Sequence, residues 1–200
     1  MSDRTAQISR RTGETDVALT LALDGAGAGE RRTGVGFLDH MLDLLARHGL
    51  LDLDVRVTGD LHTGSHHTVE DTGIVLGQAL DAALGDRAGI TRYGFAVVPM
   101  DEARAACAID LSGRPLAVLE GFDRLPAGDI AGFEHELAEE FFRAVASAAR
   151  LTLHLELQAG TNAHHMIEAC FKALARALRQ AVSVDPGETG VPSTKGTLVS

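Results

Sequence analysis

The chain contains 200 residues, of which 45% are hydrophobic and 23% are charged, and its formal net charge is −10. This apolar content is sufficient for a buried core and argues against disorder as the main state. An acidic chain with 4% aromatic residues and no Trp lacks the basic, aromatic-rich surface typical of nucleic-acid-binding proteins. No apolar run approaches a membrane span and the N-terminus lacks a signal-peptide core, so we expect a cytoplasmic protein without membrane association. Cys107 and Cys170 stand in apolar contexts and are expected to be reduced core thiols.

The spacing of apolar residues predicts strands and helices that alternate along the chain. In the first half we expect, in chain order, one or two strands within 4–24, a turn at AGAGERR, a helix over 37–47 ending at Gly49, a strand over 51–59 and a helix from His66 to near Gly85. In the second half we expect a β-rich segment over 93–120 with a turn at Ser112-Gly113, a loop over 121–132, a helix over 133–150, a strand over 151–158, a helix over 164–182 and a turn-rich tail.

The order of strand, short loop and helix beginning His-His occurs twice. Shifting the chain by 98 residues aligns 53–83 with 151–181 without a gap, and nine of the 31 positions are identical. Matches of Ala and Leu are common in amphipathic helices, but the shared HHxxE motif is not. We therefore interpret the chain as an internal duplication with an α+β fold, whose halves, 1–90 and 91–200, pack into one compact body.

Two HHxxE motifs suggest a metal centre. They comprise His66, His67 and Glu70 in the first half, and His164, His165 and Glu168 in the second. On a helix, positions i, i+3 and i+4 share a face, so each Glu is expected near both His residues of its pair. Adjacent imidazoles diverge, so we predict that each pair is divided between two metal ions. The Glu follows the pair, unlike the Glu of the HExxH signature, and is therefore interpreted as a ligand.

Other histidines are candidates to complete the two coordination spheres. We choose His40 and His154 as further ligands, the latter on the same strand face as polar neighbours. His48 is expected to interact with a helix C-terminus, and His62 and His135 are expected on the surface. All of the proposed donors are nitrogen or oxygen, which suits Mn, Fe, Ni, Co or Zn, and spacing does not choose among these metals.

Several motifs in this order resemble those of imidazoleglycerol-phosphate dehydratase, a family of histidine biosynthesis. They are GFLDHML, GDLHTGSHHTVEDTG, RYG, PMDEA, DLSGRP, HHMIEACFKALARAL and VPSTKG, spread from about Arg4 to Leu198. The resemblance implies the single-function form, a lyase that removes water from imidazoleglycerol phosphate to give imidazole acetol phosphate. It implies two manganese ions per active site at subunit interfaces, and trimers that assemble into a large octahedral homo-oligomer. Each half is expected to be a small mixed sheet with helices on one face, similar to the second domain of ribosomal protein S5.

The reaction explains why such a site would need metals. The substrate has no carbonyl group beside the proton that must be lost, so that proton is weakly acidic. Two Lewis acids at a ring nitrogen and a hydroxyl would lower the cost of a metal-bound imidazolate, which could then expel the hydroxyl through a diazafulvene-like intermediate.

The resemblance also implies roles for residues outside the HHxxE motifs. Glu14 matches the family's acid/base near the N-terminus, and Asp101 and Glu102 match an acidic pair near the metals. Five residues match positions around the substrate phosphate: Arg92, Arg114, Lys172, Ser193 and Lys195. Cations are suited to a phosphate dianion, and Arg can bind two of its oxygens at once. We expect the tail that carries Lys195 to close over bound substrate.

Two positions depart from the family pattern. Gly64 stands where an acidic residue is usual, two positions before the first His pair, and Leu44 stands where Gln is common. A divergent paralogue and another dinuclear enzyme on this fold, such as a dizinc hydrolase, are therefore alternatives. A metal-binding or RNA-binding protein with an S5-like fold is the non-enzyme alternative, and the net charge argues against RNA.

Overall fold

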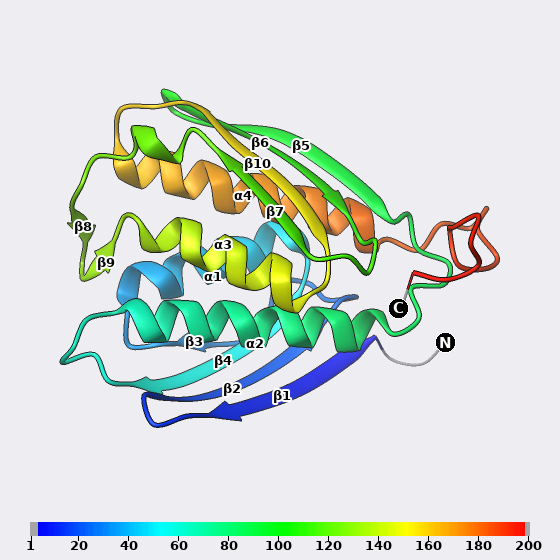
Figure 1. Ribbon diagram of the computed structural model, residues 1–200, viewed down its shortest axis with the longest axis horizontal. Coiled ribbons are helices and arrows are strands. Elements are labelled where there is room, and N and C mark those ends of the chain that lie inside the picture. The colour runs from blue at the N-terminus through cyan, green and yellow to red at the C-terminus, as the bar shows by residue number, and fades with distance from the viewer. Residues whose placement is uncertain (1–3, 199–200) are drawn as a thin grey trace.

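The computed structural model describes residues 4–198, so the outermost residues of the two predicted halves, 1–3 and 199–200, lie outside the described part. Two four-stranded sheets enclose a layer of helices (Figure 1). The first half contains β1 (Thr5–Arg11), β2 (Thr15–Ala22), β3 (Arg31–Arg32), α1 (Gly36–Gly49), β4 (Asp52–Gly59) and α2 (His66–Leu84). The second contains β5 (Tyr93–Met100), β6 (Ala103–Asp110), β7 (Leu116–Glu120), β8 (Asp129–Ile130), β9 (Phe133–Glu134), α3 (Leu137–Ala148), β10 (Thr152–Ala159) and α4 (Ala163–Val182).

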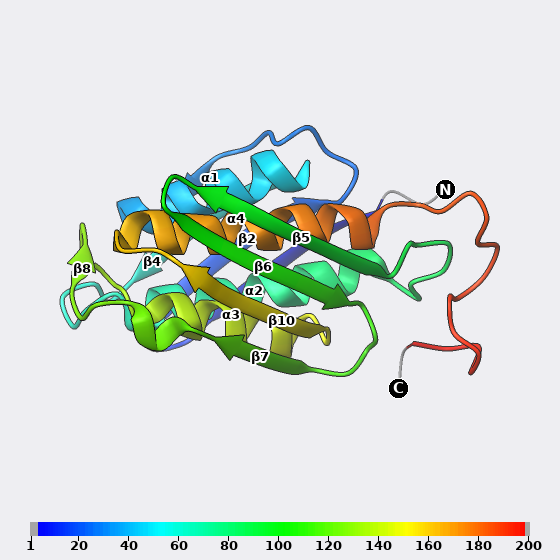
Figure 2. The same cartoon turned by 90° about the horizontal axis from the view of Figure 1, so that it is seen from above.

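The two sheets have the same topology, which confirms the duplicated α+β fold. Their strand orders are β1-β2-β4-β3 and β5-β6-β10-β7, and in both the last pair is parallel while the others are antiparallel. Alternate residues of the strands face the helices and are buried, as Val17, Leu19 and Leu21 are in β2. Figure 2, seen from above, shows the second sheet laid across α4 and α3. Each sheet therefore buries one face against the shared helical layer.

The structure corrects the predicted ungapped alignment of the halves. Leu50 and Arg150 both have positive φ after their helices, and Leu51 and Leu151 donate to the carbonyls of Ala46 and Ala146. Equivalent residues of the two halves are therefore 100 positions apart up to the start of β4 and β10. The two His-His motifs, in contrast, are 98 positions apart. The loop before α4 is thus two residues shorter than the loop before α2. Sequence identity in the helices concealed this difference.

The two halves join through their helices: α2 packs against α3, and α1 against α4. Glycines allow the first pair to approach closely. A β-carbon on Gly77 would lie 2.7 Å from the Ala148 β-carbon and the Val145 carbonyl oxygen, and one on Gly73 would lie 2.9 Å from the Ala144 β-carbon. Tight packing between these helices holds the two halves together.

Some predicted boundaries were wrong. Gly49 is the last residue of α1, and Leu50 takes the left-handed conformation instead, with its N–H bonded to Ala46. The third helix begins at Leu137, not 133, because a hairpin of β8 and β9 precedes it and Asp129 accepts a hydrogen bond from the Gly132 N–H. The turn predicted at AGAGERR also contains the short strand β3.

The two cysteines agree with the expectation of reduced core thiols. Cys107 and Cys170 are free and buried, and burial raises the pKa of both thiols. No helix within residues 4–198 combines the length and the apolar character needed to cross a bilayer.

Candidate metal and phosphate sites

The first turn of α4 carries a group of side chains with metal-ligand chemistry. Ligand atoms of His40, His164 and Glu168 all lie within 4.8 Å of one another, and His40 reaches them from α1. Glu168 Oε2 lies 3.1 Å from His164 Nε2 and 3.5 Å from His40 Nε2. Lys172 Nζ lies 2.6 Å from the other oxygen of Glu168. Burial favours a raised pKa for the Glu168 carboxyl, but the hydrogen bond and charge of Lys172 outweigh it and lower the pKa.

The first turn of α2 carries a more open counterpart. His66 Nε2 lies 3.6 Å from Glu70 Oε2, and their side chains are 55% and 44% exposed. In both motifs the Glu therefore pairs with the first His, four residues earlier. The second ring of each pair points around the helix and contacts carboxylates outside it.

The second His of the α2 motif turns towards acidic groups outside the helix. His67 Nδ1 lies 3.0 Å from Asp60 Oδ2, and His67 Nε2 lies 3.6 Å from Glu14 Oε1, at the β1–β2 turn. The hydrogen bond to Asp60 raises the pKa of His67. Burial works towards a higher pKa for Asp60, but hydrogen bonds from His67 and Thr63 outweigh it and lower the pKa. Glu14 thus lies beside the motif, and its role as acid/base stays a prediction.

The second His of the α4 motif makes an equivalent arrangement. His165 Nδ1 lies 2.7 Å from Glu102 Oε2, and His165 Nε2 lies 3.6 Å from Asp101 Oδ2, at the β5–β6 turn. Glu102 also accepts hydrogen bonds from the N–H groups of Thr161 and Asn162. The His165 and backbone hydrogen bonds hold the pKa of Glu102 far below its usual range, and Glu102 raises the pKa of His165. Each half thus brings one histidine to a carboxylate on its own first hairpin.

The rings of each pair diverge, as predicted. Those of His66 and His67 are inclined at 83°, with centroids 5.9 Å apart, and those of His164 and His165 at 79°, with centroids 6.2 Å apart. Each pair consequently presents one nitrogen donor to its Glu and another to a hairpin.

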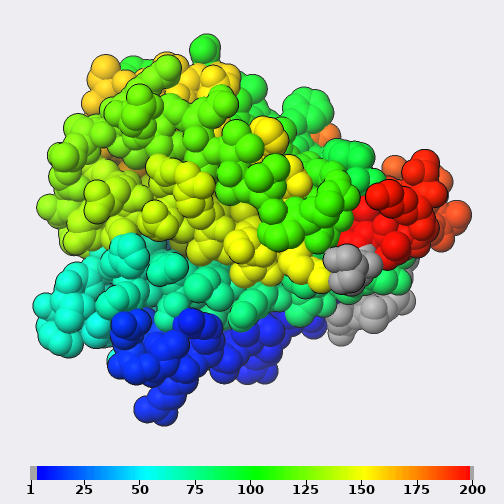
Figure 3. Space-filling model, in the orientation of Figure 1, coloured from blue at the N-terminus to red at the C-terminus, as the bar shows by residue number. Residues whose placement is uncertain are grey.

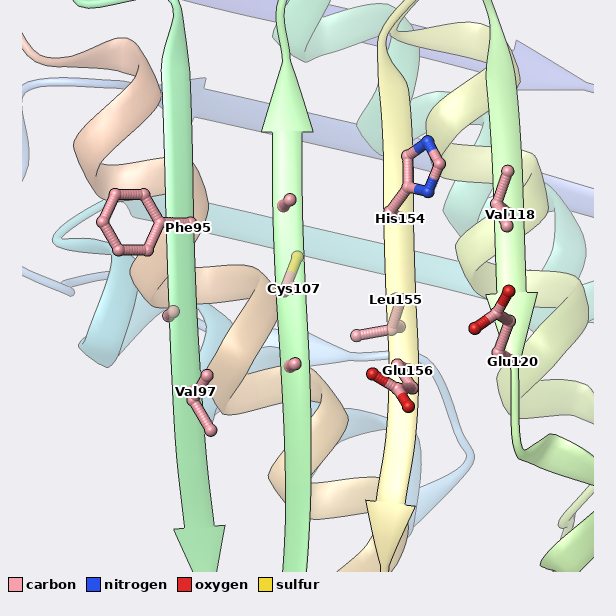
Figure 4. Close-up of a pocket in the computed structure, with 11 residues that line it drawn as sticks. Phe95, Val97, Cys107, Val118, Glu120, His154, Leu155 and Glu156 are labelled. Carbon is pink, nitrogen blue, oxygen red and sulfur yellow. The ribbon is translucent and has the colours of Figure 1, made fainter.

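His154 lies apart from these groups within one chain. Strand alternation in β10 places it on the outer face of the second sheet, whereas α4 covers the inner face. Figure 4 shows it beside Val118 of β7, in a shallow depression that Phe95 and Glu156 also line. Its polar strand face was predicted correctly, and its role as a ligand stays a prediction.

Three other histidines had predicted positions. His62 is exposed, as expected. His135 is only 8% exposed, so its predicted surface position was wrong: its Nδ1 lies 2.7 Å from the Pro126 carbonyl oxygen, which it faces beneath the 121–132 loop. His48 does lie in the last turn of α1, but burial and the charges of Lys172 and Arg176 lower its pKa. A dominant interaction with the helix dipole would raise it.

Two arginines predicted to bind phosphate meet at the other end of the molecule. Arg92 donates to both oxygens of Asp110 at 2.7 and 3.1 Å and to the Pro192 carbonyl at 2.7 Å. Arg114 Nη2 lies 3.8 Å from Asp110 Oδ2. The two arginines line one open pocket together with the tail residues Ser193 and Lys195. The pocket therefore combines three cations with several hydroxyl groups and one carboxylate, Glu188, and this excess of positive charge suits an anionic group.

The tail is attached to the body beyond Lys195. Leu198 is 6% exposed, and its carbonyl accepts a hydrogen bond from the fully buried Arg87. Arg87 also donates to the Ala149 carbonyl and to Asp81. Figure 3 shows the tail gathered at one end of the molecule. The segment that carries Lys195 is thus a loop held at both ends, since Arg92 binds it at Pro192.

Lys172 does not join this pocket. It lies beside Glu168 in the first half of α4, whereas the Arg92 N–H bonds to the Ala181 carbonyl near the end of α4. With a rise of 1.5 Å per residue, the 16 residues from His165 to Ala181 span about 24 Å. The two clusters of chemistry-bearing residues are therefore at opposite ends of one chain.

One acidic residue beside the site was missed by the sequence interpretation. Asp60 approaches His67 through the fold of the loop, and no periodicity marks it.

Comparisons with known proteins agree with the motifs. The model of the family "Imidazoleglycerol-phosphate dehydratase" matches residues 33–178. The chain is 57% identical over 196 residues to the imidazoleglycerol-phosphate dehydratase of Jannaschia sp., covering 98% of this chain and all of that protein. It is similar to the solved dehydratase of Staphylococcus aureus, with a TM-score of 0.81, 40% identity and coverage of 90% of this chain and 99% of the other. It is also similar to the Pyrococcus furiosus enzyme in complex with (S)-C348, with a TM-score of 0.80, 37% identity and coverage of 95% and 99%. The chain belongs to the imidazoleglycerol-phosphate dehydratase family of hydro-lyases.

Proposed function

We propose that this protein catalyses the metal-dependent dehydration of imidazoleglycerol phosphate to imidazole acetol phosphate in histidine biosynthesis. The observation that carries the proposal is the combination of two His–Glu clusters with a separate pocket of cations, in a member of this family. A metal-binding end suits the imidazole and hydroxyl groups of the substrate, and the cation pocket suits its phosphate. These features disfavour the RNA-binding alternative.

The donor set fits a divalent ion such as Mn²⁺. His40, His164 and Glu168 would hold one ion, since their nitrogen and oxygen atoms already converge. His66 and Glu70 would contribute to a second ion. His67 and His165 would add further ring nitrogens as ligands, and the neighbouring carboxylates would orient their rings. When bound, the ions would supply Lewis-acid stabilisation of negative charge on the substrate. Imidazole and carboxylate ligands are typical of Mn²⁺ and related metals, and no thiolate takes part.

Carboxylates beside the second histidines are suited to moving protons. Glu14 is half exposed and lies 3.6 Å from His67 Nε2, so it can both face a substrate and exchange protons with solvent. Glu102 is held as a carboxylate by its hydrogen bonds, so its contribution is to fix the ring of His165. Glu14 is therefore our candidate for the acid/base, with Asp101 and Glu102 orienting the second half-site.

The separation of the clusters supports an active site built from more than one copy of the chain. Only a three-carbon chain separates the imidazole from the phosphate in the substrate, whereas about 24 Å of α4 separates His165 from Ala181, to which the Arg92 N–H bonds. One copy would supply the metal-binding end and another the cation pocket. We therefore propose a homo-oligomer, and the trimers and octahedral assembly of the family are its expected form.

Metal removal and replacement test the chemistry. We expect the purified protein to dehydrate imidazoleglycerol phosphate, to lose this activity when stripped by a chelator and to regain it with Mn²⁺. Full activity of a stripped sample whose metal content is verified as negligible would overturn the metal dependence. No turnover by the Mn²⁺-loaded protein would overturn the assignment of substrate.

A further inference from the structure

The two metal-binding helices begin differently. The N-cap of α4 is Asn162, whose side-chain oxygen accepts hydrogen bonds from the N–H groups of His164 and His165. The offset of 98 places Gly64 at the equivalent position before α2, and glycine has no side chain to accept such bonds. The N-cap residue of α2, Ser65, makes no capping hydrogen bond either. Orphan N–H groups at a helix start are normally satisfied by such a cap.

A carboxylate from the other half occupies this place. Ser65 donates its hydroxyl hydrogen to Glu134 Oε2 at 2.6 Å, and Ser65 is only 3% exposed. A β-carbon added to Gly64 would lie 3.8 Å from the other carboxylate oxygen of Glu134. Glu134 therefore stands where a side chain at position 64 would point, next to the positive end of the helix dipole.

The duplication makes this arrangement reciprocal. The offset of 100 pairs Glu134 with Gly34 in the first half. The start of α4 is capped by its own Asn162, and the residue equivalent to Glu134 is a glycine. The start of α2 has Gly64 in place of Asn162 and receives the Glu134 carboxylate from the other half. Each metal-binding helix thus has one polar partner at its start, supplied from a different place.

We propose that Glu134 is a positioning residue that holds the first turn of α2, and with it His66 and His67, in their metal-binding orientation. The inference rests on the proposed function for the identity of the ligand. Glu134 belongs to β9, so it ties a metal-binding helix of the first half to the β8–β9 hairpin of the second. Partners that orient metal ligands typically change metal affinity about 10–100-fold when removed.

Two readouts test the proposal, one of them independent of metal and substrate. We expect Glu134→Ala to speed amide hydrogen exchange in the first turn of α2 in the metal-free protein, without changing exchange in the first turn of α4. We also expect it to weaken Mn²⁺ binding, measured by calorimetry, by about tenfold. Glu134→Gln keeps a hydrogen-bond acceptor for Ser65, so it should recover part of the affinity.

Matched variants distinguish positioning from general loss of charge or stability. Glu136→Gln removes a charge two residues away on an exposed side chain that makes no capping hydrogen bond, and should change neither readout. Ser65→Ala should reproduce Glu134→Ala, and the double variant should be no worse than either. Unchanged exchange and affinity in Glu134→Ala, or effects of the two substitutions that simply add, would overturn the proposal. Failure of the wild-type protein to turn over imidazoleglycerol phosphate would count against the proposed function and leave the exchange result as the test of Glu134.

Discussion

Lys172 Nζ lies 2.6 Å from Glu168 Oε1, one turn along the same helix, and so neutralises the carboxylate that unites His40 and His164. A metal ion bound at this group would meet the ammonium charge as a competitor for Glu168. We expect Lys172→Met to bind Mn²⁺ about two- to fivefold more tightly, or about 0.4–1 kcal/mol, while keeping the fold. Calorimetric titration of the metal-free protein measures this. Weaker binding would show that Lys172 supports the metal site.

Lys195 is expected to bind the substrate phosphate. Removing a charge-assisted partner typically costs about 1.5–3 kcal/mol, so Lys195→Ala should raise KM roughly ten- to a hundredfold. Metal content and assembly should be unchanged, because the residue lies at the far end from the His–Glu clusters. Lys195→Arg keeps the charge and serves as the control. Unchanged kinetics of Lys195→Ala would leave Arg92 and Arg114 to hold the phosphate.

Arg87 is expected to be essential for stability. It is fully buried and joins Asp81, the end of α3 and Leu198, and burial lowers the pKa of its guanidinium. Removing one member of a buried ionic network typically costs about 3–5 kcal/mol, so Arg87→Met should lower the melting temperature markedly. The comparison requires equal protein concentration, because association also stabilises a fold. A melting temperature within about 2 °C of the wild type would contradict this role.

The close approach of α2 and α3 predicts a cost for enlarging Gly77. Its new β-carbon would lie 2.7 Å from Ala148 and from the Val145 carbonyl oxygen, so the helices would have to separate. We expect Gly77→Ala to destabilise the protein by about 1–3 kcal/mol. Gln78→Ala, at the exposed neighbouring position, is the control. Equal melting temperatures for the two variants would contradict the packing argument.

His48 should make the fold sensitive to acid. Burial and nearby cations hold its pKa below the ordinary value of 6.5, so the unfolded chain binds the proton more readily than the folded chain. Its contribution to stability is therefore complete at pH values above 6.5 and is lost as the pH falls below it. His48→Gln should show a smaller loss of melting temperature than the wild type between about pH 7.5 and pH 5.5. An identical or larger loss in the variant would contradict the direction of the shift.

Periodicity predicted the parts of the fold that repeat a simple pattern. Alternation in 51–59 and 151–158 gave β4 and β10, and helical spacing gave α2 and α4 within a few residues. The short strands β3, β8 and β9 have two residues each, which is too few for a pattern to be detected. The loop that shortens the second half by two residues was hidden because the helices alone determine the best alignment.

The site was predictable to the extent that it lies on helices. Spacing paired His66 with Glu70 and His164 with Glu168, and the diverging rings followed from helix geometry. Contacts made by loops, such as that of Asp60 with His67, depend on the path of the chain and leave no local pattern. The separation of Lys172 from Arg92 likewise appears only when α4 is seen to span the molecule.

Mixing two inactive variants tests most directly whether one active site combines opposite ends of two copies. One variant carries Glu168→Gln and His164→Ala, and the other carries Arg114→Glu and Lys195→Glu. If they are co-assembled in equal amounts, random association leaves about one quarter of the sites with both an intact metal end and an intact cation pocket. We therefore predict that the mixture regains about a quarter of the wild-type activity on imidazoleglycerol phosphate. Co-assembled variants that stay as inactive as their parents would contradict a shared site.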